Sequence, residues 1–231
     1  MNNRSNCIIC GNELVYYNES KEMECIFCKN KFLSNVSCKN GHYICDNCHS
    51  LDAFSVIKNY CMSSKSSNPI KMAEELMTHP SIKMHGPEHH FLVPAVLLTA
   101  YLNKTNDTNR LEKLLNEGAK RAKNILGGFC GFYGACGAAV GTGIFISLIL
   151  DATPLSEESW GLTNLMTAKS LEKISEFGGP RCCKRDSFLA IEVSIDFVKE
   201  KLNVQLEKEE FKCKFNNMNN QCLKDKCKFY N

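Results

Sequence analysis

The sequence has little net charge, and it lacks the signals that mark several common classes of protein. Its formal charge is +3 over 231 residues, which gives little support for a nucleic-acid partner, because such partners attract strongly basic surfaces. The chain begins MNNRSNC, without the apolar stretch of a secretory signal peptide. It shows no strand followed by a Gly-x-Gly turn, a helix and a downstream acidic residue, so a nucleotide-binding methyltransferase domain is not expected.

Cysteine, in contrast, is abundant, with 15 residues. A secreted protein held together by disulfides would normally carry a signal peptide. We therefore expect a cytoplasmic protein in which the thiols bind metal or take part in catalysis. If seven thiolates bind two zinc ions, the formal net charge falls to about zero.

The longest uncharged run is GGFCGFYGACGAAVGTGIFISLIL, residues 127–150. A membrane span needs roughly 20 apolar residues, so the run is long enough to raise that interpretation. Its many glycines, its two cysteines and the lack of a second such run favour a buried helix preceded by a glycine loop. We therefore expect no membrane association.

The N-terminal cysteines come in pairs with the spacing of metal ligands. The eight candidate ligands are Cys7, Cys10, Cys25, Cys28, Cys38, His42, Cys45 and Cys48. A gap of two residues lets one tight turn present two sulfurs to a tetrahedral ion. Eight ligands complete two sites, so residues 1–50 are predicted to be a two-zinc module of treble-clef or ribbon type, with metal supplying part of its folding energy.

The segment CIFC…CKNGHYICDNC resembles the first six ligands of a RING finger, which implies an interleaved arrangement. In that arrangement the ligands of one ion are Cys25, Cys28, Cys45 and Cys48. Those of the other ion are Cys7, Cys10, Cys38 and His42. A RING finger takes its last pair from downstream and none follows here, so ubiquitin-ligase activity is not implied. The alternative is sequential, with the first four ligands on one ion and the last four on the other. We favour the interleaved arrangement.

Residues 51–69 are expected to form a linker, because MSSKSSNP at positions 62–69 is polar and rich in turn formers. A helical core domain over residues 70–205 follows, with Asn68-Pro69 as a helix-start signal. Within it, MHGPEHHFLVPAVLLTAYL predicts a central apolar helix with a polar cluster at its start. That cluster, which could ligate metal or move protons, consists of His85, Glu88, His89 and His90.

The letters His85-Gly-Pro-Glu-His89 match the inverted zinc-peptidase pattern. That motif needs both histidines on one continuous helix, and Gly86-Pro87 interrupts it, so a peptidase is not expected. A hydrogen-bonded structural cluster that caps buried helices is the alternative to a functional site.

Two further segments, CGFYGAC and GGPRCCKR, are predicted to build one sulfur-rich site. Its candidate catalytic thiols are Cys130, Cys136, Cys182 and Cys183. Helix starts and nearby cations should lower the pKa of these thiols. The cations, which would orient an anionic substrate, are Arg181, Lys184 and Arg185. The alternative is a helix-packing seam of small residues with inert buried cysteines.

The C-terminal segment, residues 206–231, carries three thiols on a polar, asparagine-rich stretch and is predicted to bind metal. These thiols are Cys213, Cys222 and Cys227. The fourth ligand would be Cys61 or a histidine, or would be absent, which leaves an open iron on a [4Fe–4S] cluster. Zinc is the alternative metal.

The combination of HGPEHH, CGFYGACGAAVGTGIF, GGPRCCKR and a cysteine-bearing tail resembles an uncharacterised cysteine-rich family of anaerobic bacteria and archaea, described as a domain of unknown function. The resemblance covers most of residues 60–231. The ACGAAVG segment also resembles redox proteins with cysteine–glycine motifs, which implies clusters or redox thiols. Neither resemblance implies a particular reaction.

We therefore predict a mainly α protein with a small zinc module before a helical core domain and a cysteine-rich tail after it. The first functional hypothesis is a cytoplasmic redox or metal-dependent protein, with an iron–sulfur cluster or redox thiols acting on a small-molecule or protein substrate. The second is a non-catalytic zinc-binding interaction or regulatory protein, whose fingers would bind a protein or nucleic acid and whose helical body would form a homodimer or sense a small molecule.

Overall fold

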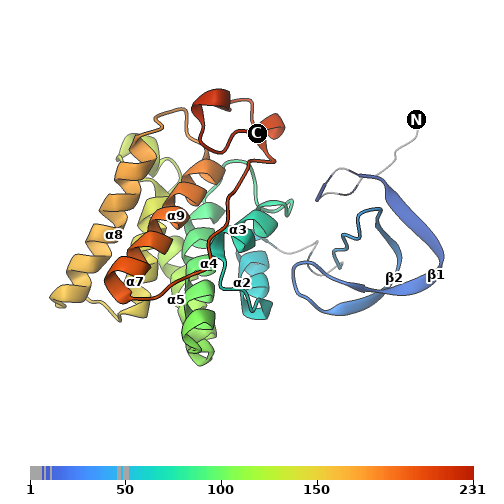
Figure 1. The fold of residues 1–231 in the computed structure, drawn as a ribbon, viewed down its shortest axis with the longest axis horizontal. Coiled ribbons are helices and arrows are strands. Elements are labelled where there is room, and N and C mark those ends of the chain that lie inside the picture. Colours follow the sequence, from blue (N-terminus) through green and yellow to red (C-terminus); the bar gives the residue numbers. More distant parts are fainter. Residues whose placement is uncertain (1–6, 8, 11, 46–47, 49–51) are drawn as a thin grey trace.

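The computed structural model of the chain describes residues 7, 9–10, 12–45, 48 and 52–231. These residues form a helical body, and the only sheet among them is a two-stranded antiparallel hairpin. The hairpin lies at one end of the molecule, and the C-terminal segment runs along the outside of the helices (Figure 1). The predicted fold class is confirmed: the protein is mainly helical, and a Cys/His module precedes the helical domain.

The hairpin consists of β1 (Leu14–Glu24) and β2 (Lys31–Cys38), with Leu14 opposite Cys38 and Glu24 opposite Lys31. Of its strand residues only Ser37 and Cys38 are buried, so it has no apolar core of its own. Cysteine ligands lie at both of its ends, because Cys25 directly follows β1 and Cys38 ends β2. A segment of this kind can be stabilised by metal ions bound at its ends.

The helical body is built from eight α-helices within the described residues, together with short 3₁₀ turns. The α-helices are α2 (Ala53–Ser63), α3 (Pro69–Met77), α4 (Glu88–Thr105), α5 (Leu111–Ala122), α6 (Phe129–Phe132), α7 (Gly137–Ile149), α8 (Glu158–Ser175) and α9 (Cys183–Leu202). The 3₁₀ turns are η1 (Thr108–Arg110), η2 (Asn216–Met218) and η3 (Lys224–Lys226). No helix in the described part of the chain combines the length and hydropathy that a membrane span requires.

Where the sequence predicts a linker over residues 51–69, the structure has helix α2. The Asp52 carboxylate caps it by accepting hydrogen bonds from the backbone N–H groups of Phe54 and Ser55, at 2.9 and 3.1 Å. Its apolar residues repeat at helical spacing and are buried against the rest of the body. Most of the polar residues that suggested a linker, positions 64–68, lie between the end of α2 and the start of α3. The start signal at Asn68 does operate, since its side chain accepts from the N–H of Lys71 at 3.1 Å.

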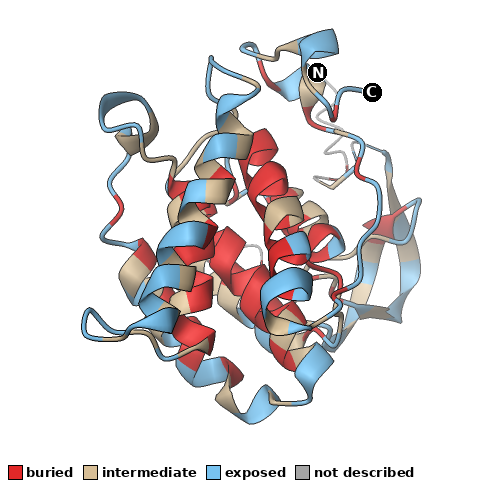
Figure 2. Ribbon diagram, turned by 60° about the vertical axis from the view of Figure 1, so that its left-hand side comes forward, coloured by how far each residue is buried: buried red, intermediate tan, exposed pale blue. Residues whose placement is uncertain are grey.

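Helix α4 is the centre of the body and packs against α2, α3, α5, α7 and α9. Its side chains from Phe91 to Ala100 are all buried. Figure 2 shows that the buried residues of the helices face one another across this centre, with exposed residues on the outer faces. An almost wholly apolar helix is therefore stable here because it is surrounded on all sides.

Helix α7 lies between α4 and α8, and glycines permit its close approach to both. A Cβ atom at Gly141 would lie 2.9 Å from Cδ of Pro94 on α4. One at Gly143 would lie 2.1 Å from Oγ1 of Thr167 on α8. Gly141 and Gly143 thus form a helix-packing seam, which was the alternative interpretation of the run, whereas an added Cβ at Gly127, Gly131 or Gly134 would meet nothing within 4 Å.

After α9 the chain doubles back along the body. The backbone N–H of Glu207 donates to the carbonyl of Ser67 at 3.1 Å, and Lys228 forms an ion pair with Glu192. Buried aromatic side chains attach the segment to the core, because Phe211 and Phe229 pack on Phe188 of α9. The cysteine-rich tail is therefore an integral layer of the helical body.

Candidate functional site

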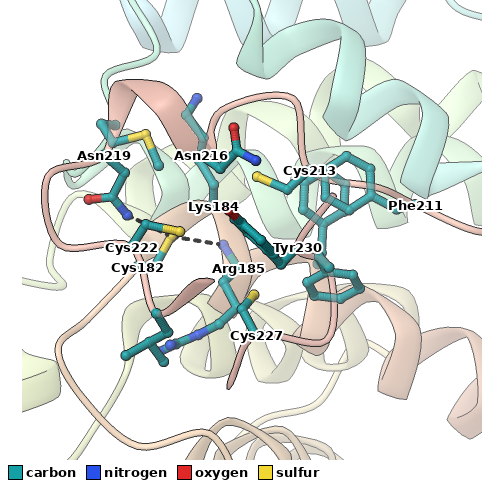
Figure 3. Close-up of a pocket in the computed structure, with 14 residues that line it drawn as sticks. Cys182, Lys184, Arg185, Phe211, Cys213, Asn216, Asn219, Cys222, Cys227 and Tyr230 are labelled. Carbon is teal, nitrogen blue, oxygen red and sulfur yellow. Dashed lines mark hydrogen bonds between the residues drawn. The ribbon is translucent and has the colours of Figure 1, made fainter. Parts of the chain in front are cut away.

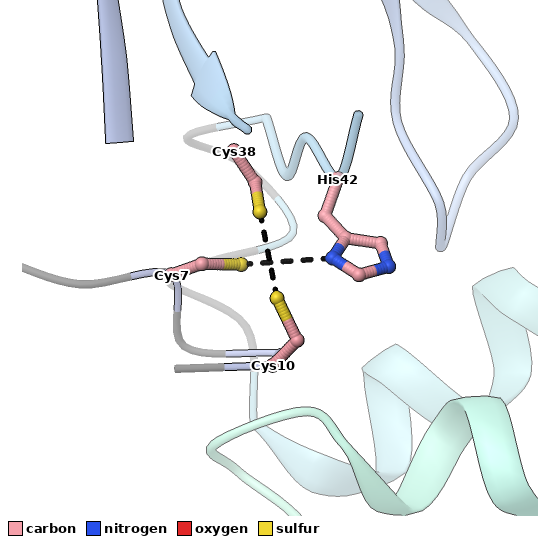
Figure 4. A group of neighbouring side chains, drawn as sticks. All are labelled: Cys7, Cys10, Cys38 and His42. Carbon is pink, nitrogen blue, oxygen red and sulfur yellow. Dashed lines mark hydrogen bonds between the residues drawn. The ribbon is translucent and has the colours of Figure 1, made fainter. Parts of the chain in front are cut away.

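The first group of candidate metal ligands lies beyond the end of the hairpin that holds Cys38. Its members, whose ligand atoms all lie within 4.8 Å of one another, are Cys7, Cys10, Cys38 and His42. The sulfurs of Cys10 and Cys38 are 3.4 Å apart, and Sγ of Cys7 is 3.8 Å from Nδ1 of His42. Ligands about 2.3 Å from a tetrahedral ion would stand about 3.8 Å from each other. Figure 4 shows the three sulfurs and the Nδ1 edge of the imidazole turned toward a common centre.

The second group lies at the turn between the strands. Its members are Cys25, Cys28, Cys45 and Cys48, again with all ligand atoms within 4.8 Å of one another. The sulfurs of Cys28 and Cys45 are 3.9 Å apart, and the backbone N–H of Cys45 donates to Sγ of Cys25 at 3.5 Å. The two groups are those of the interleaved arrangement, and both could hold a metal ion.

The second group is joined to the helical body. Phe27, between two of its ligands, is fully buried and packs edge-on against His79 and Tyr60, with ring centroids 4.5 and 6.5 Å away. The His79 imidazole donates from Nε2 to the carbonyl of Cys48 at 2.9 Å. This site thus forms one continuous core with α2 and α3, whereas the sequence suggested a separate module.

The predicted sulfur-rich site corresponds to an open cavity between the start of α4, the α6–α7 loop and the start of α9. We call it the cysteine–histidine cavity. Its thiols and polar side chains are Cys130, Cys136, Cys183, His85, His89, His90, Arg181 and Asp186. Its empty volume is about 1370 Å³, with open solvent at the mouth included. Groups from positions 85, 130 and 183 therefore meet at one place.

The helix-start argument for low thiol pKa values is wrong at these positions. Burial raises the pKa of Cys136 to about 12, and the neighbouring Asp186 carboxylate adds to this, although the N–H groups of Ala138 and Ala139 oppose it. Burial likewise raises the pKa of Cys183. Desolvation outweighs the helix dipole because both thiols are largely shielded from water. Without a metal ion, both are protonated near neutral pH.

The three histidines have different surroundings. Nδ1 of His90 lies 3.1 Å from the carbonyl oxygen of Ile125. A carbonyl oxygen can only accept, so Nδ1 carries the proton and donates this hydrogen bond. The lone pair of Nε2 is then free to bind a metal ion or a proton. Nε2 of His85 is 3.3 Å from the amide oxygen of Asn219. Nδ1 of His85 is buried and has no hydrogen-bond partner within the described residues. An orphaned buried nitrogen of this kind is what a ligand or metal ion would satisfy.

His89 is held by structural contacts. It is fully buried, and its Nε2 donates to the carbonyl of Lys83 at 3.0 Å. Burial, followed by the neighbouring Lys184 charge, lowers the pKa of His89 to about 3. His89 is therefore neutral at physiological pH.

This shift predicts acid sensitivity. The folded-state pKa is below the unfolded value of about 6.5, so below pH 6.5 the unfolded chain binds a proton that the folded protein does not. The free energy of unfolding is therefore highest above pH 6.5 and decreases as the pH falls. We expect a loss of about 1.4 kcal/mol per pH unit below 6.5, hence about 2 kcal/mol at pH 5. Denaturant titrations at pH 7, 6 and 5 measure this. His89→Gln keeps an N–H donor for Lys83 but cannot be protonated, so its stability should fall less steeply. Equal slopes of unfolding free energy against pH in the two proteins would contradict the prediction. Release of metal in acid does not affect this comparison, because it occurs equally in both proteins.

Some predicted residues lie outside the cavity. The Glu88 carboxylate accepts from the backbone N–H of Lys83 at 2.8 Å and does not line the cavity. Lys184 is buried, and its Nζ donates to the carbonyl of Met77 at 2.8 Å. Cys61 is fully buried in the core of α2, where burial raises its pKa to about 12. Of the three predicted substrate-binding cations, only Arg181 lines this cavity.

The adjacent cysteines 182 and 183 are divided between two sites. Cys183 lines the cysteine–histidine cavity, whereas Cys182 lines a second pocket together with the thiols of the C-terminal segment. Figure 3 shows that pocket, with Cys182, Cys213, Cys222 and Cys227 arranged around it. Consecutive residues at a helix start point in different directions, so two neighbouring thiols need not share a site.

Asp186 is a candidate functional residue that the sequence reasoning did not assign. It is buried at the cavity wall and pairs with Arg185, whose Nε donates to its Oδ1 at 2.9 Å. Burial raises the pKa of Asp186, while Arg185 opposes this. The sequence did contain a pattern that could have identified it. The segment reads CCKRD, and position 186 lies one helical turn after Cys182.

Comparison with known proteins identifies a family but no function. The model of a family of unknown function (DUF5714) matches residues 57–230. The match spans the helical body and the C-terminal segment and begins inside α2, so both cysteine sites of the body fall within it. No curated protein and no solved structure matches the chain.

Proposed function

The chain belongs to the DUF5714 family, and we propose that it is a metal-dependent redox protein whose chemistry takes place in the cysteine–histidine cavity. One observation carries this proposal. Three thiols from two separate segments, Cys130 and Cys136 from one and Cys183 from the other, line one open cavity together with an imidazole nitrogen that lacks a partner among the described residues.

The raised thiol pKa values favour a metal centre over a free dithiol. A disulfide-exchanging thiol needs appreciable thiolate at neutral pH, and Cys136 and Cys183 are held in the protonated form by burial. A bound metal deprotonates its thiol ligands outright. Three thiolates would hold an iron–sulfur cluster and leave one position open to substrate.

The other residues of the cavity support a binding role around such a centre. His90, with its free Nε2, and His85, with its unpartnered Nδ1, would ligate the centre or transfer protons. Arg181 is exposed at the cavity wall and would orient an anionic small molecule or protein side chain. All 15 cysteines are free thiols, which suits the cytoplasm. The zinc assignment for the two N-terminal groups rests on their S₃N and S₄ ligand sets, which suit that ion.

The test is metal analysis of protein purified without oxygen. We expect iron and acid-labile sulfide in the wild-type chain, and a loss of one cluster's content in Cys136→Ser. Cys61→Ala removes a buried thiol outside the cavity and should retain the full content. The proposal fails if only zinc is found and Cys136→Ser leaves the metal content and the thiol alkylation rate unchanged.

A second function is favoured by the hairpin. Tyr16 and Leu33 are 72% and 76% exposed on it, and such apolar side chains on a metal-stabilised scaffold suit contact with a protein partner. In this alternative the chain is a non-catalytic interaction protein. A metal content of two zinc ions per chain, unaffected by any change in the cysteine–histidine cavity, would favour it over the first proposal.

A further inference from the structure

A second cysteine site lies where the C-terminal segment crosses the start of α9. Cys182 precedes α9, and the other three thiols come from the returning segment. They surround one pocket with an empty volume of about 420 Å³, solvent at its opening included (Figure 3). Cys61, the fourth ligand considered from sequence, does not line it. Cys182 supplies the missing thiol from 31 residues before Cys213.

The backbone around these thiols is arranged as in a metal site. Sγ of Cys213 accepts from the N–H of Phe215 at 3.4 Å, and Sγ of Cys222 accepts from the N–H of Lys224 at 3.4 Å. The same two-residue spacing occurs in the first N-terminal group, where Cys38 accepts from the N–H of Asn40 at 3.3 Å. N–H donors of this kind stabilise metal-bound thiolate and tune its properties.

The spacing of the four thiols distinguishes this site from the N-terminal groups. Three or more ligand atoms lie within 4.8 Å of one another only in those two groups, as far as the described residues extend. No three of the thiols around the tail pocket are therefore as close together as the ligands of a single tetrahedral ion would be. A cluster of four irons and four sulfides is larger than one ion, and its thiolates stand correspondingly further apart.

The surroundings suit an anionic cluster. Phe188, Phe211 and Phe229 pack together on one side, with the first two stacked at 3.6 Å between ring centroids. Lys184 and Arg185 line the same pocket and are 2% and 4% exposed. Arg185 is ion-paired with Asp186 through Nε, but its Nη1 has no hydrogen-bond partner within the described chain, and Lys184 has no ion-pair partner there. The buried Lys184 charge needs compensation, and four thiolates around an iron–sulfur core would supply it.

We propose that Cys182, Cys213, Cys222 and Cys227 hold a [4Fe–4S] cluster, separate from the centre in the cysteine–histidine cavity. Four thiolates occupy all four irons, so this cluster has no open position for substrate, unlike the open iron expected from three tail thiols. The two sites are adjacent, because Cys182 and Cys183 are neighbours in the chain. In addition, the Asn219 side chain lies 3.7 Å from Sγ of Cys182 and 3.3 Å from Nε2 of His85.

The test compares single-cysteine variants of the full chain, expressed and purified without oxygen. Iron, sulfide and zinc are measured, and electron paramagnetic resonance spectra are recorded after dithionite reduction. We expect Cys222→Ser and Cys213→Ser each to lose four irons and four sulfides per chain relative to wild type. Cys61→Ala is the matched control and should lose none.

This inference does not depend on the proposed function, because the two ligand sets share no residue. Cys136→Ser should leave the signal of the tail cluster intact, and Cys222→Ser should remove that signal alone. Two results would overturn it. One is that Cys222→Ser loses zinc and no iron, and the other is that Cys222→Ser and Cys61→Ala contain equal amounts of iron and sulfide. If the serine variants do not fold, Mössbauer spectra of the wild-type protein provide the test. A spectrum without the signal of a [4Fe–4S] cluster ligated by four thiolates would also overturn the proposal.

Discussion

Cys25→Ser should release one metal ion and destabilise the helical body as well as the hairpin. Cys25 is fully buried, and its metal group shares a core with α2 and α3 through Phe27. Loss of a structural metal is among the few single changes that cost more than about 4 kcal/mol. Metal analysis and helix unfolding followed by far-ultraviolet circular dichroism measure the two effects.

Cys10→Ser is the matched control, because it removes an exposed ligand from the other group. It should also release one ion. The helix unfolding midpoint should nevertheless stay close to that of the wild type, since no cysteine of that group belongs to the core that Cys25 shares with α2 and α3. If Cys25→Ser and Cys10→Ser lowered the midpoint equally, the idea that only one metal site supports the body would be wrong.

Gly137→Ala should displace the His90 ring and disrupt the cysteine–histidine cavity. An added Cβ would lie 2.1 Å from Cδ2 and 2.3 Å from Nε2 of His90. The ring cannot remain there, and its movement breaks the hydrogen bond to the carbonyl of Ile125. We expect a loss of about 2–3 kcal/mol, from overpacking and the lost hydrogen bond together, measured by denaturant unfolding.

A double-mutant cycle tests the cause. In a His90→Ala background the clash is absent, so Gly137→Ala should cost little there, with a coupling of about 2 kcal/mol between the two positions. Gly131→Ala is the control in the same cavity wall, because its added Cβ meets nothing within 4 Å. Additive effects of Gly137→Ala and His90→Ala would show that the glycine acts through something other than the His90 ring.

Several features follow from local patterns and were correctly predicted. The mainly helical fold, the start of α3 at Asn68-Pro69 and the N-terminal ligand groups depend on spacing between neighbours in the chain. The interleaved grouping was implied by the resemblance of the segment from Cys25 to Cys48 to a RING finger, and the structure has the same two groups. Helix α2 was not predicted, because the polar run SKSSN that follows it led us to interpret the whole stretch as a linker. The helical spacing of the buried positions 56, 57, 60 and 61 was overlooked.

The thiol chemistry could not be predicted in the same way. A helix start and nearby cations suggested low pKa values for Cys136, Cys182 and Cys183, whereas burial raises all three. The degree of desolvation at a side chain depends on which distant segments cover it. For the same reason, the sequence could not show that Lys184 and Arg185 belong beside the tail thiols.

By itself, then, the sequence determined most of the helices, because the residues that signal them are a few positions apart, and its resemblance to a RING finger implied the two N-terminal groups of candidate metal ligands. Only the tertiary structure decided that Cys182 joins the tail thiols while Cys183 joins Cys130 and Cys136. That division depends on how α4, α7, α9 and the returning segment pack around the start of one helix. Packing of this kind brings together residues far apart in the chain, and no local pattern records it.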